Sequence, residues 1–114
     1  MKRIMYAPAA LASLEDILEW TIETFGDVQA EKYASQLVSR LEALASGLPP
    51  RPRPCAVLVQ DKRDVTGLTY YREGEHYLIL RETRDTLELV EVFHGRMDIE
   101  ARLRGLRFPE EGQG

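Results

Sequence analysis

Residues 49–54 read Pro-Pro-Arg-Pro-Arg-Pro, and this run divides the chain into two parts with different periodicities. Proline has no backbone N–H and its ring restricts φ, so the run can continue neither a helix nor a central strand. Before the run, apolar side chains recur every three or four residues, as on one face of a helix. After it they alternate with polar ones, as in a strand. With 114 residues the chain has the size of one domain, and we predict an α+β domain in which a short connector joins helices to a sheet.

Two helices joined by a tight turn are predicted before the prolines. The first begins at Pro8, because proline is tolerated in the first turn of a helix. Gly26 can supply the left-handed residue that ends it, and we expect Asp27 to cap a second helix that ends by Leu48. The apolar positions expected to face the core are Leu11, Leu14, Leu18, Ile22 and Phe25 in the first helix, and Ala30, Ala34, Leu37, Leu41, Leu44 and Leu48 in the second.

Three strands rich in β-branched and aromatic residues are predicted after the prolines, over residues 67–72, 76–83 and 86–94. The turns between them are short enough to make an antiparallel meander. Because successive side chains of a strand point to opposite faces, two sets are expected. Leu78, Leu80, Leu87, Leu89 and Val92 should face the helices, and Tyr77, Ile79 and Arg81 should point the other way.

Shorter elements complete the predicted domain, which spans residues 1–108. A short strand is expected over residues 3–7 and a short helix over residues 98–103. Residues 60–64 read as a loop and residues 109–114 as a mobile tail. The predicted fold is therefore a short N-terminal strand and an antiparallel helical hairpin packed on a three-stranded or slightly larger antiparallel β-sheet, followed by a short C-terminal helix.

The charge of the chain weakens an assignment to non-specific nucleic-acid binding. The formal net charge is −4 and the pI is near 5.2, whereas such binding takes its affinity from Lys and Arg side chains that neutralise phosphates. The acidic excess lies in residues 1–48, with a net charge of −3, and in residues 109–114, with −2; residues 49–108 carry +1.

The sequence predicts neither export nor a membrane span. No stretch approaches the roughly 20 apolar residues that cross a bilayer. Lys2 and Arg3 are not followed by the apolar run of about 7–15 residues that a secretory signal needs. Cys55 is the only cysteine and can form no internal disulfide, so a reducing cytoplasm is the simplest compartment. We expect its thiol to be buried or unreactive.

Few residues are candidates for chemistry. With two histidines and one cysteine, no metal site is expected. His76 and His94 lie at the ends of predicted strands, where a structural or surface role is favoured over that of a general base. Arginines in the second half could bind phosphates or carboxylates, but ordinary ion pairing with acidic neighbours explains them equally well. The pairs are Arg63 with Asp61 or Asp64, Arg72 with Glu73, Arg81 with Glu82, and Arg96 with Asp98.

A second stripe on the first helix carries a large aromatic side chain away from the predicted core face. It comprises Ser13, Ile17, Trp20 and Thr24. Such a stripe is either an interface or is covered by the N-terminal strand or the C-terminal segment.

The order of these parts, together with several local patterns, resembles a known family. The patterns are Asp16-Ile17 within residues 9–20, Gly26-Asp27 followed by Gln29-Ala30 and Tyr33, the strand 76–81 ending in Leu80-Arg81, and the closing segment 90–98 with His94 and Asp98. They extend from Tyr6 to Leu103 and are similar to the ParE/RelE superfamily, the toxins of bacterial toxin–antitoxin modules.

The resemblance implies one of two activities. RelE-type members are ribosome-dependent endoribonucleases; in that case Arg72, Arg81 and Arg96 would stabilise phosphate charge and His94 would act as acid or base. ParE-type members are implied to inhibit DNA gyrase without cleaving RNA. The acidic net charge, the closing segment without a terminal tyrosine, and Leu80 in place of the usual tyrosine favour the ParE branch. An inactive toxin fold that binds only its antitoxin is a third possibility.

For a ParE-type member, the resemblance implies protein partners and no cofactor, metal or catalytic residue. DNA gyrase would be bound through Arg81, His94 and Arg96. A ParD-like antitoxin would lie as a helix or extended segment along the hairpin and the sheet edge, contacting Ile17, Trp20 and Tyr33 and forming a hetero-oligomer. Neither a membrane nor a specific nucleic-acid sequence is an expected partner.

Overall fold

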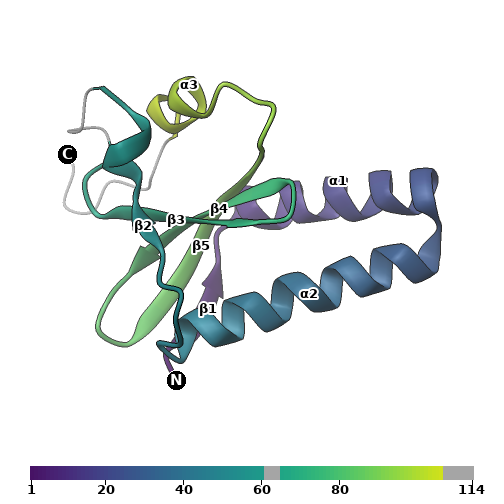
Figure 1. Cartoon of the computed structure of the whole chain (residues 1–114), viewed down its shortest axis with the longest axis horizontal. Coiled ribbons are helices and arrows are strands. Elements are labelled where there is room, and N and C mark those ends of the chain that lie inside the picture. The colour runs from purple at the N-terminus through teal and green to yellow at the C-terminus, as the bar shows by residue number, and fades with distance from the viewer. Residues whose placement is uncertain (61–64, 107–114) are drawn as a thin grey trace.

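The computed structural model describes residues 1–60 and 65–106 of the chain (Figure 1). Arg63, most of the predicted loop 60–64 and the predicted tail 109–114 lie outside the described residues. The elements are β1 (Arg3–Tyr6), α1 (Pro8–Phe25), α2 (Asp27–Ala45), β2 (Arg53–Pro54), the 3₁₀ helix η1 (Cys55–Leu58), β3 (Leu68–Glu73), β4 (His76–Glu82), β5 (Thr86–His94) and α3 (Ile99–Arg104). The predicted α+β class and element order are confirmed.

The strands form one five-stranded sheet in the order β1-β5-β4-β3-β2. The predicted antiparallel meander β3-β4-β5 is its centre, and two short strands extend it. On one edge β1 runs parallel to β5. On the other edge Arg53 and Pro54 pair with Tyr70 and Thr69, a position that proline tolerates because an edge strand needs fewer backbone donors.

The face of α1 that meets the sheet is not the predicted one. Leu11, Ile22 and Phe25 are 46%, 45% and 62% exposed, so their assignment to the core is wrong. The residues that face the sheet or pack against its core are Ala10, Leu14, Ile17 and Thr21. This stripe also has helical spacing, and the small Ala10 lets the helix approach the sheet closely. The Thr21 hydroxyl can be buried there because it donates to the carbonyl of Ile17 at 2.7 Å.

Helix α2 follows the prediction except at its ends. Its buried residues include Ala30, Leu37, Leu41 and Leu44, as expected. Leu48, however, lies beyond the end of the helix and is 55% exposed. Asp27 is not the N-cap: Gly26 holds that position with φ 93° and no side-chain cap bond forms. Asp27 is instead the first helical residue, where a negative charge interacts favourably with the helix dipole.

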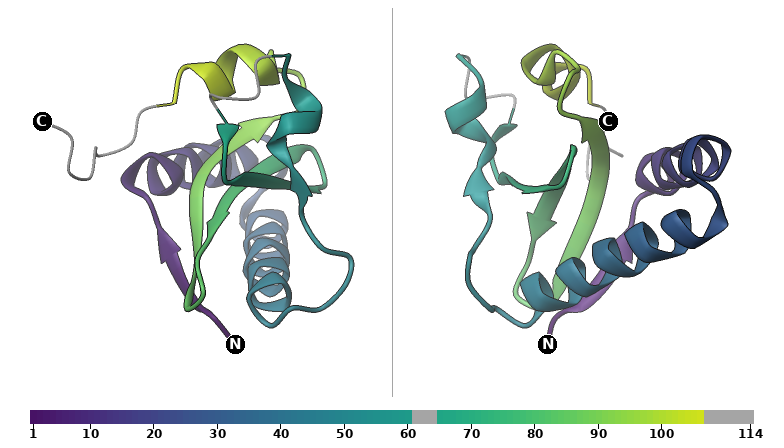
Figure 2. Two further views of the ribbon diagram at one scale, coloured as in Figure 1. Left: turned by 90° about the vertical axis from the view of Figure 1, so that its left-hand side faces the viewer. Right: turned by 45° about the vertical axis from the view of Figure 1, so that its right-hand side comes forward.

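The helical hairpin covers one face of the sheet, and the other face has a second core (Figure 2). The hairpin packs on Leu78, Leu80, Leu87, Leu89 and Val92, which confirms the predicted helix-facing set. The second core, under η1 and α3, consists of Cys55, Val59, Val65, Leu68, Ile79, Val90, Phe93 and Leu103. Ile79 points away from the hairpin, as predicted, and is completely buried in this second core.

An irregularity in the β4–β5 pairing allows β5 to contribute side chains to both cores. Ile79 is opposite Glu91 whereas Leu80 is opposite Leu89, so Val90 is an extra residue in β5. Val90 consequently joins the second core, while Leu89 and Val92 both face the hairpin although they are three residues apart.

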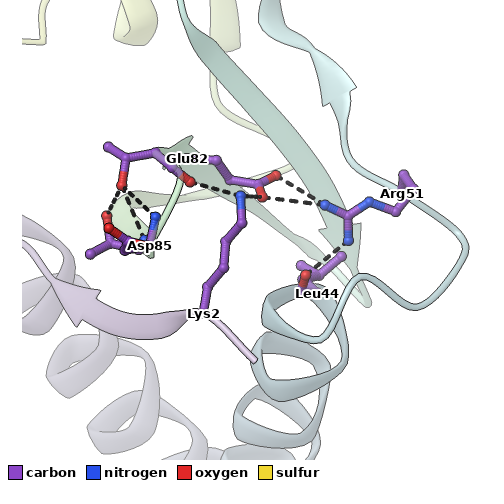
Figure 3. A network of polar contacts seen from close by, with 7 residues as sticks. Lys2, Leu44, Arg51, Glu82 and Asp85 are labelled. Carbon is purple, nitrogen blue, oxygen red and sulfur yellow. Dashed lines mark hydrogen bonds and ion pairs between the residues drawn. The ribbon is translucent and has the colours of Figure 1, made fainter.

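A polar network joins the N-terminus, the proline run and the sheet (Figure 3). Lys2 Nζ donates to Glu82 Oε2 at 2.7 Å and to the carbonyl of Thr83 at 2.8 Å. Arg51 donates to Glu82 Oε1 at 3.1 Å and to the carbonyl of Leu44 at 2.8 Å, near the end of α2. One carboxylate thus holds β1 and the connector against β4.

The burial of two isoleucine side chains predicts different losses of stability when each is replaced by alanine. Ile79→Ala should lower the free energy of unfolding by about 2–5 kcal/mol, because it leaves a cavity in a closed core. Ile22→Ala, at a position that is 45% exposed, should change it by only about 0.5 kcal/mol. Urea unfolding followed by circular dichroism measures both. Equal losses would show that the second face of the sheet is not a packed core.

Candidate binding groove

A groove of about 630 Å³ lies between the helical hairpin and the end of the sheet where the β3–β4 turn and the end of β5 meet. Both helices extend beyond this turn (Figure 1). Its lining residues from the hairpin are Ser13, Asp16, Ile17, Trp20, Thr21, Phe25, Gln29 and Tyr33; those from the sheet side are Gly74, Glu75, His76, Val92, His94, Arg96 and Met97.

Exposed apolar side chains stand on both walls of the groove. Trp20 is 58% exposed and Phe25 is 62% exposed, and their rings meet edge to face with centroids 5.7 Å apart. Met97, on the sheet side, is 40% exposed. Large side chains that remain this accessible are typical of a surface that binds another molecule. Among the described residues, neither β1 nor the C-terminal helix covers Trp20, so the interface interpretation of its stripe is the one that the geometry supports.

Two histidines stand side by side in the groove. His76 and His94 are directly opposite in the β4–β5 register, and their rings meet edge to face at 5.3 Å. Nδ1 of His94 accepts the backbone N–H of Arg96 at 3.0 Å, so in neutral His94 the hydrogen is on Nε2. Nδ1 of His76 lies 2.6 Å from the hydroxyl of Tyr33.

A buried polar cluster ties α2 to the β3–β4 turn beside these histidines. The Tyr33 hydroxyl donates to the carbonyl of Glu73 at 3.2 Å, so both its contacts are satisfied when His76 Nδ1 carries the hydrogen and donates to the phenol. The Glu73 carboxylate, in a residue only 9% exposed, accepts Arg40 Nε at 2.8 Å and Gln36 Nε2 at 3.0 Å. Burying this charge is possible because it is paired and hydrogen-bonded.

Burial and charge shift the pKa values of Tyr33 and His76 in directions that keep these two side chains neutral near pH 7. Burial, followed by the charges of Glu73 and Glu75, raises the pKa of Tyr33 to about 12. Burial, followed by the neighbouring His94, lowers the pKa of His76 below its usual value, and Glu75 opposes this in part. The His76 side chain is therefore a neutral hydrogen-bonding group in the groove near pH 7 and carries no positive charge there.

Five residues that the sequence placed in two separate sites meet in this groove. Ile17, Trp20 and Tyr33, predicted to contact an antitoxin, line it together with His94 and Arg96, predicted to contact the target. His76, Phe25 and Met97, for which no binding role was predicted, line it too. His76 begins β4 and His94 ends β5, so a hairpin brings them to the same end of the sheet, but their direct pairing depends on a register that includes the irregularity in β5.

Neither Arg81 nor Arg72 is among the residues that line the groove. Arg81 is at the far end of β4 and donates to Glu88 Oε1 from Nε at 3.0 Å and from Nη2 at 2.7 Å. Arg72 is opposite Tyr77, lies over its ring at 5.4 Å and donates to the carbonyl of Gly74 at 3.1 Å. Nη2 of Arg72 lies 3.4 Å from the position that a Cβ atom on Gly95 would occupy, so Arg72 is near the end of β5 and only Arg81 is separated from His94.

The ion pairs differ from those expected between sequence neighbours. Glu73 pairs with Arg40, Glu82 with Lys2 and Arg51, and Arg81 with Glu88. Asp98 accepts the N–H of Ala101 at 3.2 Å and caps α3. Adjacent residues of a strand point to opposite faces, so a strand arginine meets a residue across the strands rather than its neighbour in the chain.

Cys55 is completely buried, as expected, and burial raises the pKa of its thiol to about 12. Among residues 1–60 and 65–106, no group of three or more His, Cys, Asp or Glu side chains is placed to hold a metal ion. In the same part of the chain, no helix has both the length and the apolar composition to cross a membrane.

Comparison with known structures shows to which class this fold belongs. The structure is similar to a chain described as "Chromosomal ParDE TA system from P. aeruginosa", with a TM-score of 0.63 and 15% sequence identity over 82% of this chain and 96% of that chain. The likeness at this identity concerns the fold, a helical hairpin on an antiparallel sheet.

The sequence itself assigns the family. Residues 4–99 match the family described as the ParE toxin of type II toxin–antitoxin systems, parDE. The chain is also 32% identical over 102 residues to Toxin ParE1 from two strains of Mycobacterium tuberculosis, CDC 1551 / Oshkosh and ATCC 25618 / H37Rv, covering 89% of this chain and 97% of each relative. The chain belongs to the ParE toxin family of type II toxin–antitoxin systems.

The lowered pKa of the partly buried His76 predicts how the stability of the fold depends on pH. Because the pKa of His76 is lower in the folded chain than in the unfolded one, the unfolded state takes up the proton first as the pH falls below about 6.5. The free energy of unfolding should therefore fall between pH 7.5 and pH 5, and His76→Asn should show a shallower fall. Urea titrations at a series of pH values measure both slopes; identical slopes would contradict the assignment to His76.

Proposed function

We propose that this chain inhibits bacterial DNA gyrase in the cytoplasm and is neutralised by a ParD-like antitoxin. Membership of the ParE toxin family supports the assignment to a toxin–antitoxin pair. One observation supports the proposed neutralisation of the toxin. The residues expected to contact the antitoxin (Ile17, Trp20 and Tyr33) and two of those expected to contact the target (His94 and Arg96) line the same groove. A single segment of antitoxin in this groove would therefore cover residues that the target needs.

The antitoxin is expected to bury the exposed aromatic edge of the groove. Trp20 and Phe25 together offer large, rigid apolar area, and Tyr33 is already held by Glu73 and His76. Preorganised aromatic side chains lose little conformational entropy on binding and are frequent hot spots of protein interfaces. The product is a hetero-oligomer of toxin and antitoxin.

Gyrase is expected to contact the side of the groove formed by the end of β5. Arg96 is exposed there, with its backbone N–H held by His94, and can offer a guanidinium to a carboxylate or phosphate of the trapped enzyme–DNA complex. Arg81 is paired with Glu88 at the opposite end of β4, so it would make a separate contact with the target.

Gyrase inhibition is better supported than ribosome-dependent RNA cleavage. Cleavage would use Arg72, Arg81 and Arg96 with His94 around one phosphate, but Arg81 is held by Glu88 at the opposite end of β4. The family assignment points the same way.

The affinity of the antitoxin tests the role of Trp20 in the groove. Trp20→Ala should weaken its binding by about 2 kcal/mol or more, a loss of about thirtyfold in affinity, because a central aromatic anchor is removed. Leu11→Ala, at an exposed position on another side of α1, should leave the affinity nearly unchanged. Isothermal titration calorimetry with purified antitoxin measures both. An equal effect of the two substitutions would remove the groove from the antitoxin interface.

Another prediction concerns the target. Toxin freed of antitoxin should inhibit supercoiling of relaxed plasmid by gyrase, with linear DNA accumulating, and the antitoxin should relieve the inhibition. Arg96→Ala should weaken the inhibition by about tenfold, whereas Arg84→Ala, an exposed arginine outside the groove, should not. Absence of inhibition at micromolar toxin would contradict the proposal, and cleavage of RNA on translating ribosomes would then be tested.

A further inference from the structure

The helical hairpin that forms one wall of the groove carries an acidic stretch of sequence, of which Asp16 lines the groove itself. Residues 4–31, which include α1 and the start of α2, contain no lysine or arginine and six acidic residues: Glu15, Asp16, Glu19, Glu23, Asp27 and Glu31. A stretch of this length with one sign of charge sets up a negative potential along the hairpin, even though the chain as a whole is only moderately acidic.

Within the described part of the chain, these six carboxylates form no ion pair. Among residues 1–60 and 65–106, the ion pairs involve Glu73, Glu82 and Glu88, and none of the six acidic residues of the hairpin takes part. Asp16 lines the groove directly. Glu23 is seven residues further along α1 and therefore projects within about 20° of the same direction, next to Trp20. The aromatic edge is thus bordered by two carboxylates that form no ion pair within residues 1–60 and 65–106.

The opposite wall has a different character. Arg96, His76 and His94 line it together with Glu75, so its formal charge is close to zero and its groups are hydrogen-bonding rather than acidic. An occupant of the groove therefore meets an acidic, aromatic wall on one side and a mixed polar wall on the other. Electrostatic complementarity selects a partner whose positive charges face the hairpin.

We propose that the occupant of this groove is an amphipathic segment whose apolar side chains contact Trp20, Phe25 and Met97 and whose lysine or arginine side chains face Asp16 and Glu23 of α1. The proposal rests on the proposed function in one respect, namely that the segment belongs to the antitoxin. It adds the chemistry of that segment, whose side chains facing the hairpin are cationic, whereas the toxin that it binds is acidic.

The single tryptophan of the chain provides a local readout of occupancy. Two synthetic amphipathic peptides without tryptophan, with identical leucine faces and a polar face of either lysine or glutamate, would be titrated into the full-length toxin. Burial of the 58% exposed Trp20 should shift its fluorescence to shorter wavelength. At low ionic strength the lysine peptide should bind about tenfold more tightly than the glutamate peptide, and the difference should shrink at about 0.5 M salt.

A pair of variants assigns the preference to the groove. The double substitution Asp16→Asn and Glu23→Gln should reduce the tenfold preference to about threefold or less, because it removes the two carboxylates beside Trp20. Glu42→Gln removes one exposed carboxylate from the far part of α2 and should leave the preference unchanged. Circular dichroism of each variant confirms that the fold is retained.

Three results would overturn the proposal. Equal affinity of the two peptides, or preference for the glutamate peptide, would show that charge does not select the occupant. A lack of response of Trp20 to either peptide would show that the groove does not take such a segment. A shift of Trp20 that depends on toxin concentration alone would assign the groove to a second copy of the chain. Neither gyrase nor antitoxin enters this assay, so its failure is separable from failure of the proposed function.

Discussion

The central strand pair β4–β5 is buried on both faces, and the rest of the structure follows from that constraint. Leu78, Ile79 and Leu80 are consecutive and completely buried, although successive side chains of a strand point in opposite directions. Two separate layers are therefore needed, the helical hairpin on one face and η1 with α3 on the other. A sheet that is covered in this way leaves binding surface only where the strands end, and the groove is at that end.

The shape of the groove depends on the polar cluster that joins its two walls. The hairpin extends beyond the sheet, and the middle of α2 is joined to the sheet by Tyr33, Gln36 and Arg40, which all hydrogen-bond to Glu73 at the end of β3. These bonds favour one position of α2, because a shift would leave the nearly buried Glu73 carboxylate without its partners.

A shared groove offers a simple physical basis for neutralisation of a toxin. Trp20 lies on one wall and Arg96 on the other, so a single segment bound as proposed would contact both. The acidic hairpin adds selectivity, because six carboxylates in residues 4–31 repel an acidic segment and attract a basic one. Apolar contact and charge then have different roles, the first in affinity and the second in the choice of partner.

The sequence by itself determined the order and type of the elements, the connector and the helix-facing set of β4 and β5, because periodicity, Gly26 and the prolines act over a few residues. Tertiary structure alone decided that Ala10 rather than Leu11 faces the sheet, since two stripes of α1 have the same spacing and only packing selects between them. It also decided that Ile79 is buried, that Arg81 pairs with Glu88, and that His76 and Trp20 line one groove. These facts depend on strand register and on contacts between distant parts of the chain, which no local pattern encodes.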